Sequence, residues 1–300
     1  MKLSRRLVVA FGVEALLLAA IVTVAADLYA HKRTDMLAGR NIWGYRGAVA
    51  HQKEPNEIRF IVVGGTRAFA LGMPATWTTA TVVQQEVMLA IDRPGRPIRH
   101  FIGVDLAQPS ALPGSYAQTI EHFAYLKPDV VCLYDDLGVG GGPLLDESSG
   151  MYARTGYLPA LPLVLTEKRN RLLQTAGLAL MRLDRSFART PRERETDTRG
   201  YVAAMLRAID VASLNSRGVV IALSPVESDL QSRNYAALIP ELQKRIAANR
   251  RVRLVDLNGI AALREPQFRL DGGWSYGGDA TAAASKAIAP AVLQLIEPSR

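Results

Sequence analysis

RFIVVGGTRAFALG, Arg59–Gly72, is the stretch of sequence that decides the fold. A run rich in β-branched residues ends in Gly64 and Gly65 and is followed by Thr66, as at a buried strand that ends in a tight turn. Such a turn usually serves either a ligand or a nucleophile. Thr66 is therefore the first candidate for a functional residue.

Segments with strand and helix patterns alternate along the chain. This alternation predicts an α/β fold in which helices cover both faces of a parallel sheet, with ligands beyond the carboxyl ends of the strands. The run 138–199 interrupts the pattern and predicts a lid or an insertion. The strand-like runs are 58–63, 97–104, 129–134, 218–223 and 252–257, and the helical patterns are 79–92, 116–126, 201–214, 235–248 and 280–296.

The amino-terminal segment Leu7–Ala26 is apolar, with Glu14 as its one charge. At about 1.5 Å per residue it spans roughly 30 Å, the thickness of a bilayer's hydrocarbon core. We expect a transmembrane anchor at 7–26, cytoplasmic residues 1–6, and an extracytoplasmic (periplasmic) body on an inner membrane. A cleavable signal peptide ending near Val24–Ala26 is the alternative, and basic residues on both sides of the segment leave the opposite orientation open.

Composition narrows the classes of partner. The chain has 36 Lys+Arg against 28 Asp+Glu, a net charge of +8, but the two signs are interspersed and no basic run carries interleaved aromatic residues. This pattern favours a surface beside a membrane over nucleic-acid binding. The single cysteine, Cys132, excludes an internal disulfide framework and is predicted to be buried, and the mixed polar run 27–56 predicts a stalk.

The order of these pieces resembles the SGNH (GDSL-like) hydrolase superfamily, in particular its bacterial members with one amino-terminal membrane helix. The similarity covers roughly Asn41 to Ile296 and rests on NIWGYRG (41–47), IVVGGTRAFALG (61–72), LKPDVVCLYDD (126–136), GVVIALSP (218–225), VRLVDLNG (252–259) and LDGGW (270–274). The resemblance implies a flavodoxin-like three-layer αβα domain over 57–300, with a five-stranded parallel sheet of order 2-1-3-4-5.

In that family a serine attacks an ester, a histidine in a D-x-x-H motif is the base, and the aspartate orients the histidine. The resemblance places Thr66 at the serine, Asp271 at the aspartate and Trp274 at the histidine. An indole cannot accept a proton, so the family's hydrolytic mechanism lacks its base here. The four histidines of the chain, at 31, 51, 100 and 122, are not expected at the carboxyl ends of the strands.

The family's oxyanion donors are altered as well. Leu106 falls at the position of a glycine, where a backbone N–H remains but the side chain crowds the substrate. Either Asp136 or, in a shifted register, Gly138 stands where the family has an asparagine. An aspartate repels an oxyanion and a glycine has no side-chain donor, and loss of one donor typically costs about 10²–10³ in rate. The remaining predicted binding residues are Gly65, Arg67 and Asp135.

Two functions follow from this comparison. The first is a catalytically degenerate protein with a binding or assembly role on cell-envelope carbohydrate or lipid. The alternative is an active esterase or O-acyltransferase on acylated envelope glycans, in which Thr66 is the nucleophile and Asp135 or Asp136 is an unusual base. The carboxylates lack ligand-type spacing and the glycine-rich turn lacks a nucleotide-binding pattern, so we expect neither a metal nor a cofactor.

Overall fold

The computed structural model describes residues 5–37, 40–41, 43–70, 73–91, 100–108, 111–138, 161, 198–265, 267, 269–270 and 275–297. Asp271 and Trp274 lie outside the described residues. The same holds for the predicted lid or insertion at 138–199, apart from its two ends and Leu161.

A five-stranded sheet forms the centre of the body. Its strands are β1 (Glu57–Gly64), β2 (His100–Asp105), β3 (Val130–Asp135), β4 (Gly218–Leu223) and β5 (Val252–Asp256). They run in the order β2-β1-β3-β4-β5, and every neighbouring pair is parallel. This confirms the predicted α/β fold and its strand order. Because the strands are parallel, the turn after β1 and the residues after β3 meet at one edge of the sheet.

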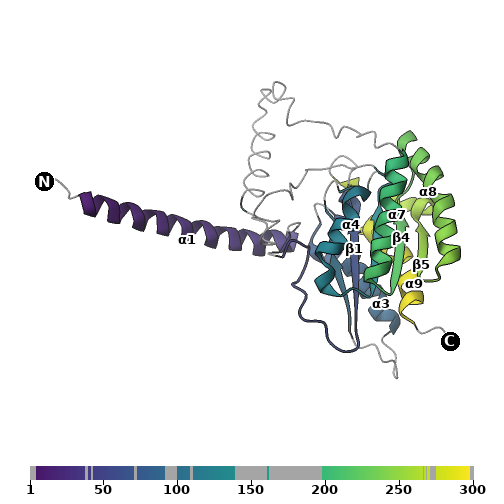
Figure 1. The fold of residues 1–300 in the computed structure, drawn as a ribbon, viewed down its shortest axis with the longest axis horizontal. Helices are drawn as coiled ribbons and strands as arrows, with labels where there is room; N and C mark the ends of the chain where they lie inside the picture. The colour runs from purple at the N-terminus through teal and green to yellow at the C-terminus, as the bar shows by residue number, and fades with distance from the viewer. Residues whose placement is uncertain are drawn as a thin grey trace.

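Helices cover both faces of the sheet (Figure 1). On one face α3 packs against α9, and on the other α4 packs against α7, which also contacts α8. A small antiparallel pair, β6 (Arg269–Leu270) and β7 (Ser275–Tyr276), lies outside the main sheet. Among the described residues, the helices of the body are α2 (Thr66–Phe69), α3 (Thr79–Ile91), α4 (Pro113–His122), α7 (Thr198–Asn215), α8 (Asp229–Ala248) and α9 (Gly278–Ile296), with 3-10 turns η1 (Ala75–Trp77), η2 (Ala124–Leu126), η4 (Leu257–Gly259) and η5 (Ala261–Leu263).

The core has two halves, one on each face of the sheet. Along β3, Val130 and Cys132 pack in one half, while Val131 and Leu133 pack in the other. Since both faces are covered, the central strands β3 and β4 are nearly continuous apolar runs instead of alternating apolar and polar residues. Cys132 is 0% exposed, as predicted.

A long helix, α1 (Arg5–Leu37), precedes the body and extends away from it (Figure 1). Its segment Phe11–Ala30 has a mean hydropathy of 2.0 and is long and apolar enough to cross a membrane. The predicted anchor at 7–26 therefore lies on a continuous helix that runs eleven residues farther than expected, to Leu37.

The stretch that follows α1 packs on the body. Arg40 and Tyr45 are 4% and 2% exposed, and the N–H of Arg46 donates to the carbonyl oxygen of Asp105 at 2.9 Å. The stalk predicted over 27–56 therefore needs correction from Arg40 onward, because the side chains of Arg40, Asn41, Tyr45 and Arg46 are buried. The guanidinium of Arg46 donates to the carbonyl oxygens of Phe69, Ala70 and Met73.

Candidate functional site

The turn after β1 has the tight geometry that its two glycines predict. A Cβ on Gly64 would lie 2.3 Å from the carbonyl oxygen of Tyr134, so only glycine lets β1 and β3 approach so closely here. A Cβ on Gly65 would lie 3.0 Å from Oδ2 of Asp136. Thr66 opens α2 and is 2% exposed, so the residue at the predicted nucleophile position is buried.

Arg67, the next residue of α2, is a buried cation at the centre of the site. Its NH2 donates to Oε2 of Glu227 at 2.6 Å, and its Nε lies 3.7 Å from Oδ1 of Asp136. Its guanidinium also lies over the ring of Tyr276, 5.0 Å from the ring centroid. The NH1 of Arg67 is buried and has no hydrogen-bond partner among the described residues.

The Arg67 guanidinium is held in its charged form. Burial by itself lowers the pKa of Arg67, but the negative charge of Asp136, followed by Tyr276 and Glu227, raises the pKa above its usual value. A cation at this position is thus stabilised by groups from three different parts of the chain.

Asp136 lies directly against the Thr66 turn. Its Oδ1 accepts a hydrogen bond from Oγ of Ser224 at 2.7 Å, and its carboxylate also accepts one from the backbone N–H of Arg67. Burial raises the pKa of Asp136, although Arg67 and Ser224 act to lower it. Of the two candidates for the asparagine position, Asp136 is the one that the structure brings beside Gly65 and Arg67.

Asp135 is adjacent in sequence but has different neighbours. Its Oδ1 accepts from the hydroxyl of Tyr116 at 3.0 Å, and its Oδ2 accepts from the hydroxyl of Tyr201 at 2.6 Å. Burial raises the pKa of Asp135 to about 6, while the hydrogen bond from Tyr201 opposes the rise. These bonds join β3 to α4 and α7, so the two aspartates do not act on one ligand as a pair.

Leu106 lies in the sheet and the core. Its N–H donates to the carbonyl oxygen of Val62 at 2.8 Å, and its side chain is 2% exposed in the core. The expectation of an available N–H and a side chain facing the substrate therefore needs correction, because the β1–β2 ladder continues one residue past β2. Two residues on, Gln108 donates its N–H to the carbonyl oxygen of Gly64 at 2.9 Å.

Gly138 ends the described chain after β3. Its φ is +80°, a conformation that favours glycine, and a Cβ there would lie 2.6 Å from Nδ2 of Asn234. That same Nδ2 donates to the carbonyl oxygen of Leu137 at 2.8 Å, whereas Oδ1 of Asn234 is buried and has no hydrogen-bond partner in the described part of the chain. Gly138 thus contributes close packing against α8.

Several residues of the site were missed in the sequence. Ser224 and Glu227 follow β4, in the run SPVE, and Gln231 of α8 donates from Nε2 to the backbone carbonyl of Asp136 at 3.1 Å. The available signal was their position: polar residues directly after a buried parallel strand lie at the carboxyl edge. Tyr276 carried no such signal, because its neighbourhood depends on the small β6–β7 sheet.

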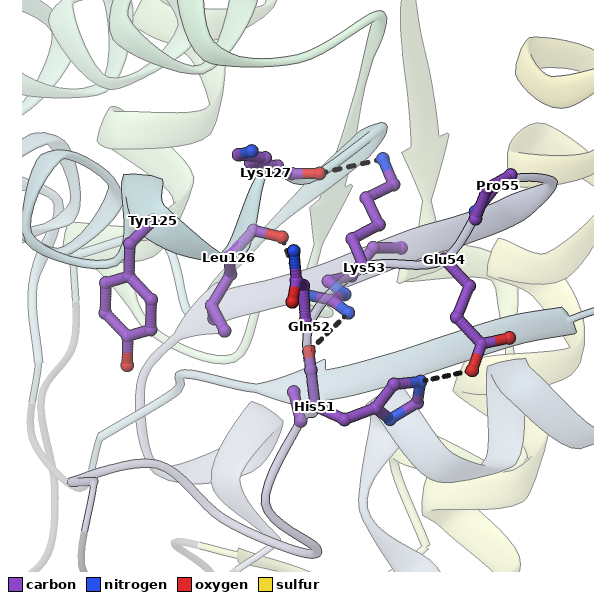
Figure 2. A pocket seen from close by; sticks show the side chains of 10 residues that line it. His51, Gln52, Lys53, Glu54, Pro55, Tyr125, Leu126 and Lys127 are labelled. Carbon is purple, nitrogen blue, oxygen red and sulfur yellow. Dashed lines mark hydrogen bonds and ion pairs between the residues drawn. The ribbon is translucent and has the colours of Figure 1, made fainter.

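A hollow of about 520 Å³ lies at the opposite, amino edge of the sheet (Figure 2). It is bordered by residues 50–55 and 125–127 and by Arg59. Arg59 donates to Oε1 of Glu57, to the carbonyl oxygen of Leu126 and to that of His51. In Figure 2 the side chain of His51 reaches toward Glu54, an ion pair of 3.6 Å when the imidazole is protonated. This edge is a network of satisfied charges that fastens residues 51–55 to the sheet.

The similarity of the chain to known proteins is at the level of solved structures. No protein-family model and no curated protein matches the chain. Among solved structures, it resembles a family two carbohydrate esterase from Clostridium thermocellum in complex with cellohexaose, with 9% identity and a TM-score of 0.46, over 80% of this chain and 65% of that one. This chain thus spans just under two thirds of that esterase.

Two further solved structures are covered over most of their own length. A lipolytic G-D-S-L family protein from Veillonella parvula has 14% identity and a TM-score of 0.42, over 80% of this chain and 98% of that one. A family 3 carbohydrate esterase from Clostridium thermocellum has 14% identity and a TM-score of 0.43, over 77% of this chain and 93% of that one. At such identities a likeness does not extend to activity, so the chemistry of the site has to come from its own residues.

Proposed function

We propose that the chain is a membrane-anchored, extracytoplasmic SGNH-hydrolase-like protein that no longer hydrolyses esters and serves in binding or assembly on cell-envelope carbohydrate or lipid. The observation that carries the proposal is the carboxylate of Asp136 beside the Thr66 turn. Acyl transfer needs hydrogen-bond donors where charge develops, and a carboxylate there accepts hydrogen bonds and repels an oxyanion.

The charge balance of the site favours a neutral, hydroxyl-bearing ligand. Arg67 is flanked by two carboxylates, Asp136 and Glu227, so its positive charge is already compensated. An anionic ligand would have to compete with both. A sugar hydroxyl can donate a hydrogen bond to a carboxylate oxygen and accept one from NH1 of Arg67, which has no hydrogen-bond partner among the described residues.

The proposal is tested on the full chain in detergent. Hydrolysis of an aryl acetate and labelling by a fluorophosphonate serine-hydrolase probe should both equal those of Thr66→Ala. In parallel, calorimetry with oligosaccharide fragments of the cell wall should show binding that Glu227→Ala weakens about tenfold, the cost of one charged hydrogen bond. Glu241→Ala is the matched control, because Glu241 forms an exposed ion pair with Lys244 on α8 and should leave binding unchanged.

A second candidate is an active esterase or O-acyltransferase that uses Thr66, and one observation favours it. The NH1 of Arg67 is a buried, charged donor without a partner, one residue from Thr66, and such a donor can hold an oxyanion. This candidate would be established if the natural chain hydrolyses an aryl acetate, Thr66→Ala abolishes the activity and a chelator leaves it unchanged. That result would contradict the proposal that the protein no longer hydrolyses esters.

A further inference from the structure

One face of α1 is buried close to the end of its apolar segment. Asp27 and Ala30, three residues apart, are 6% and 7% exposed, whereas Leu28 and Tyr29 between them are 49% and 65% exposed. Residues three apart lie on the same face of a helix. Oδ1 of Asp27 accepts a hydrogen bond from the N–H of Leu161 at 2.7 Å, and η1 packs against α1. The body therefore touches the helix itself.

These contacts fall within the last turn of the candidate membrane span, which ends at Ala30. The sequence continues there as HKR at 31–33, residues typical of the headgroup region. Because Arg40, Asn41, Tyr45 and Arg46 are buried, the chain that follows α1 does not act as a free spacer between the helix and the sheet. A body that contacts the end of a membrane-spanning helix must lie at the bilayer surface.

Two tryptophans are exposed in the segments involved, η1 and the stretch that follows α1. Trp77 belongs to η1, the turn that packs on α1, and is 42% exposed. Trp43 lies six residues after the end of α1 and is 49% exposed. Tryptophan is costly to expose to water and is enriched at membrane interfaces, where its ring is in an apolar layer and its N–H meets water or headgroups.

We propose that the body rests on a phospholipid bilayer through the surface around η1 and Trp43, with Trp77 and Trp43 in the headgroup layer. The occupant of this surface is the bilayer because the surface continues directly from the end of the apolar span. The inference rests on the membrane anchoring of the proposed function, and it adds an orientation to that anchoring.

The orientation brings the site to the membrane. Arg46, which is buried three residues after Trp43, donates to the carbonyl oxygens of Phe69, Ala70 and Met73, and the N–H of Met73 donates to the carbonyl of Ala70 at 3.1 Å. These bonds tie the surface to α2, which carries Thr66 at its start. The Thr66 turn therefore lies close to the membrane-facing surface, and the class of ligand that this position favours is an amphiphile with a glycan headgroup and a lipid tail.

The test uses tryptophan fluorescence of the full chain in vesicles of phosphatidylcholine and phosphatidylglycerol. With Trp43→Phe and Trp274→Phe, Trp77 is the sole emitter, and lipids brominated close to the headgroup should reduce its emission about twofold. The complementary variant, with Trp77→Phe and Trp274→Phe, reports on Trp43 in the same way. The matched control is Leu214→Trp in a chain whose three natural tryptophans are replaced by phenylalanine. Leu214 is 86% exposed and lies where α7 leads into β4, at the amino edge of the sheet.

The proposal is supported if the brominated lipids quench Trp77 and Trp43 but do not quench the tryptophan of the Leu214→Trp chain. Equal quenching at the three positions, or no quenching at any of them, overturns it. Flotation of the same vesicles distinguishes failure of the membrane anchoring from failure of the proposed orientation. If the chain floats with the vesicles but is not quenched, the anchoring holds and the orientation is wrong. If the chain does not float, both the anchoring and the orientation are wrong. If the substituted backgrounds unfold, the natural chain gives a second measurement, because Trp77→Phe alone should then lower the quenched fraction.

Discussion

The two edges of the sheet bury charge in opposite ways. At the amino edge Arg59 uses every arm of its guanidinium, on Glu57 and on the carbonyl oxygens of Leu126 and His51. At the carboxyl edge Arg67 leaves NH1 buried without a partner among the described residues. Buried polar groups are normally paired, so an unpaired donor at one edge marks where a ligand can complete the hydrogen bonding.

The carboxyl edge also concentrates carboxyl groups whose pKa is raised. Burial raises the pKa of Asp105 to about 7, against the opposing charges of Arg46 and Arg40, and Oδ2 of Asp105 has no hydrogen-bond partner in the part of the chain that is described. Burial likewise raises the pKa of Asp135 to about 6. The amino edge therefore pairs its buried charges, whereas the carboxyl edge holds carboxyl groups whose burial is only partly compensated by their neighbours.

The largest effect is expected at the amino edge. Arg59→Leu leaves the carboxylate of Glu57, whose side chain is 0% exposed, without its cation, and should lower the free energy of unfolding by about 3–5 kcal/mol. Urea unfolding of the full chain in detergent measures the change. Arg217→Ala is the control, since Arg217 is 77% exposed in its pair with Asp129 and should cost less than about 1 kcal/mol. Equal costs for the two variants would mean that the amino edge is not the stabilising one.

The second prediction concerns hydrolysis at the carboxyl edge. Thr66→Ser with Trp274→His supplies a serine and a histidine beside the aspartate that the family resemblance identifies as Asp271, because only a histidine there can accept the serine proton near neutral pH. Arylesterase activity should be at background in the natural chain and rise by about 10²-fold in the double variant. The activity should stay below that of an enzyme with a complete site, because the carboxylate of Asp136 repels the oxyanion.

Two further variants sharpen this prediction. Thr66→Ser alone should stay at background, and adding Asp136→Asn to the double variant should raise the rate again, since an amide can donate a hydrogen bond. A double variant without activity would contradict the placement of Trp274 at the base position.

The third prediction is a dependence of stability on pH. An unfolded aspartate titrates near pH 4 and Asp105 in the folded chain titrates near pH 7, so between these values the folded state binds more protons. Stability should therefore fall as the pH rises from about 4 to about 7. Asp105→Asn should reduce this fall by up to about 4 kcal/mol, the value for a shift of about three pKa units, as measured by urea unfolding across that range. A residual slope up to about pH 6 should remain from Asp135, and an unchanged slope would exclude Asp105 as its source.

The smallest effect is expected at Asp135. Tyr201→Phe removes one of its two tyrosine donors and should lower the free energy of unfolding by about 1 kcal/mol, while binding of cell-wall fragments stays the same because Asp135 joins β3 to α4 and α7. The control is Tyr235→Phe, which breaks an exposed bond to Asp256 and should change stability less. Weaker ligand binding by Tyr201→Phe would place Asp135 in the site after all.

Much of the fold could be predicted because its signals are local. Strand and helix patterns alternate along the chain, and a parallel sheet buried on both faces requires continuous apolar strands such as β3. The pair Gly64 and Gly65 also predicted a tight turn, and the structure gives the reason: at Gly64 the close approach of β1 to β3 leaves no room for a Cβ. The position of Thr66 at the carboxyl edge follows from the direction of β1.

The sequence by itself determined the α/β class, the strand order through its family resemblance, the apolar span of α1 and the Thr66 turn. Only the tertiary structure decided that Asp136 faces the turn while Asp135 faces two tyrosines, because neighbouring residues at a strand's end diverge and a register shift of one would exchange them. It also decided that Arg40, Tyr45 and Arg46 are buried and that the N–H of Leu106 belongs to the sheet. These features depend on partners far apart in the chain, which no local pattern specifies.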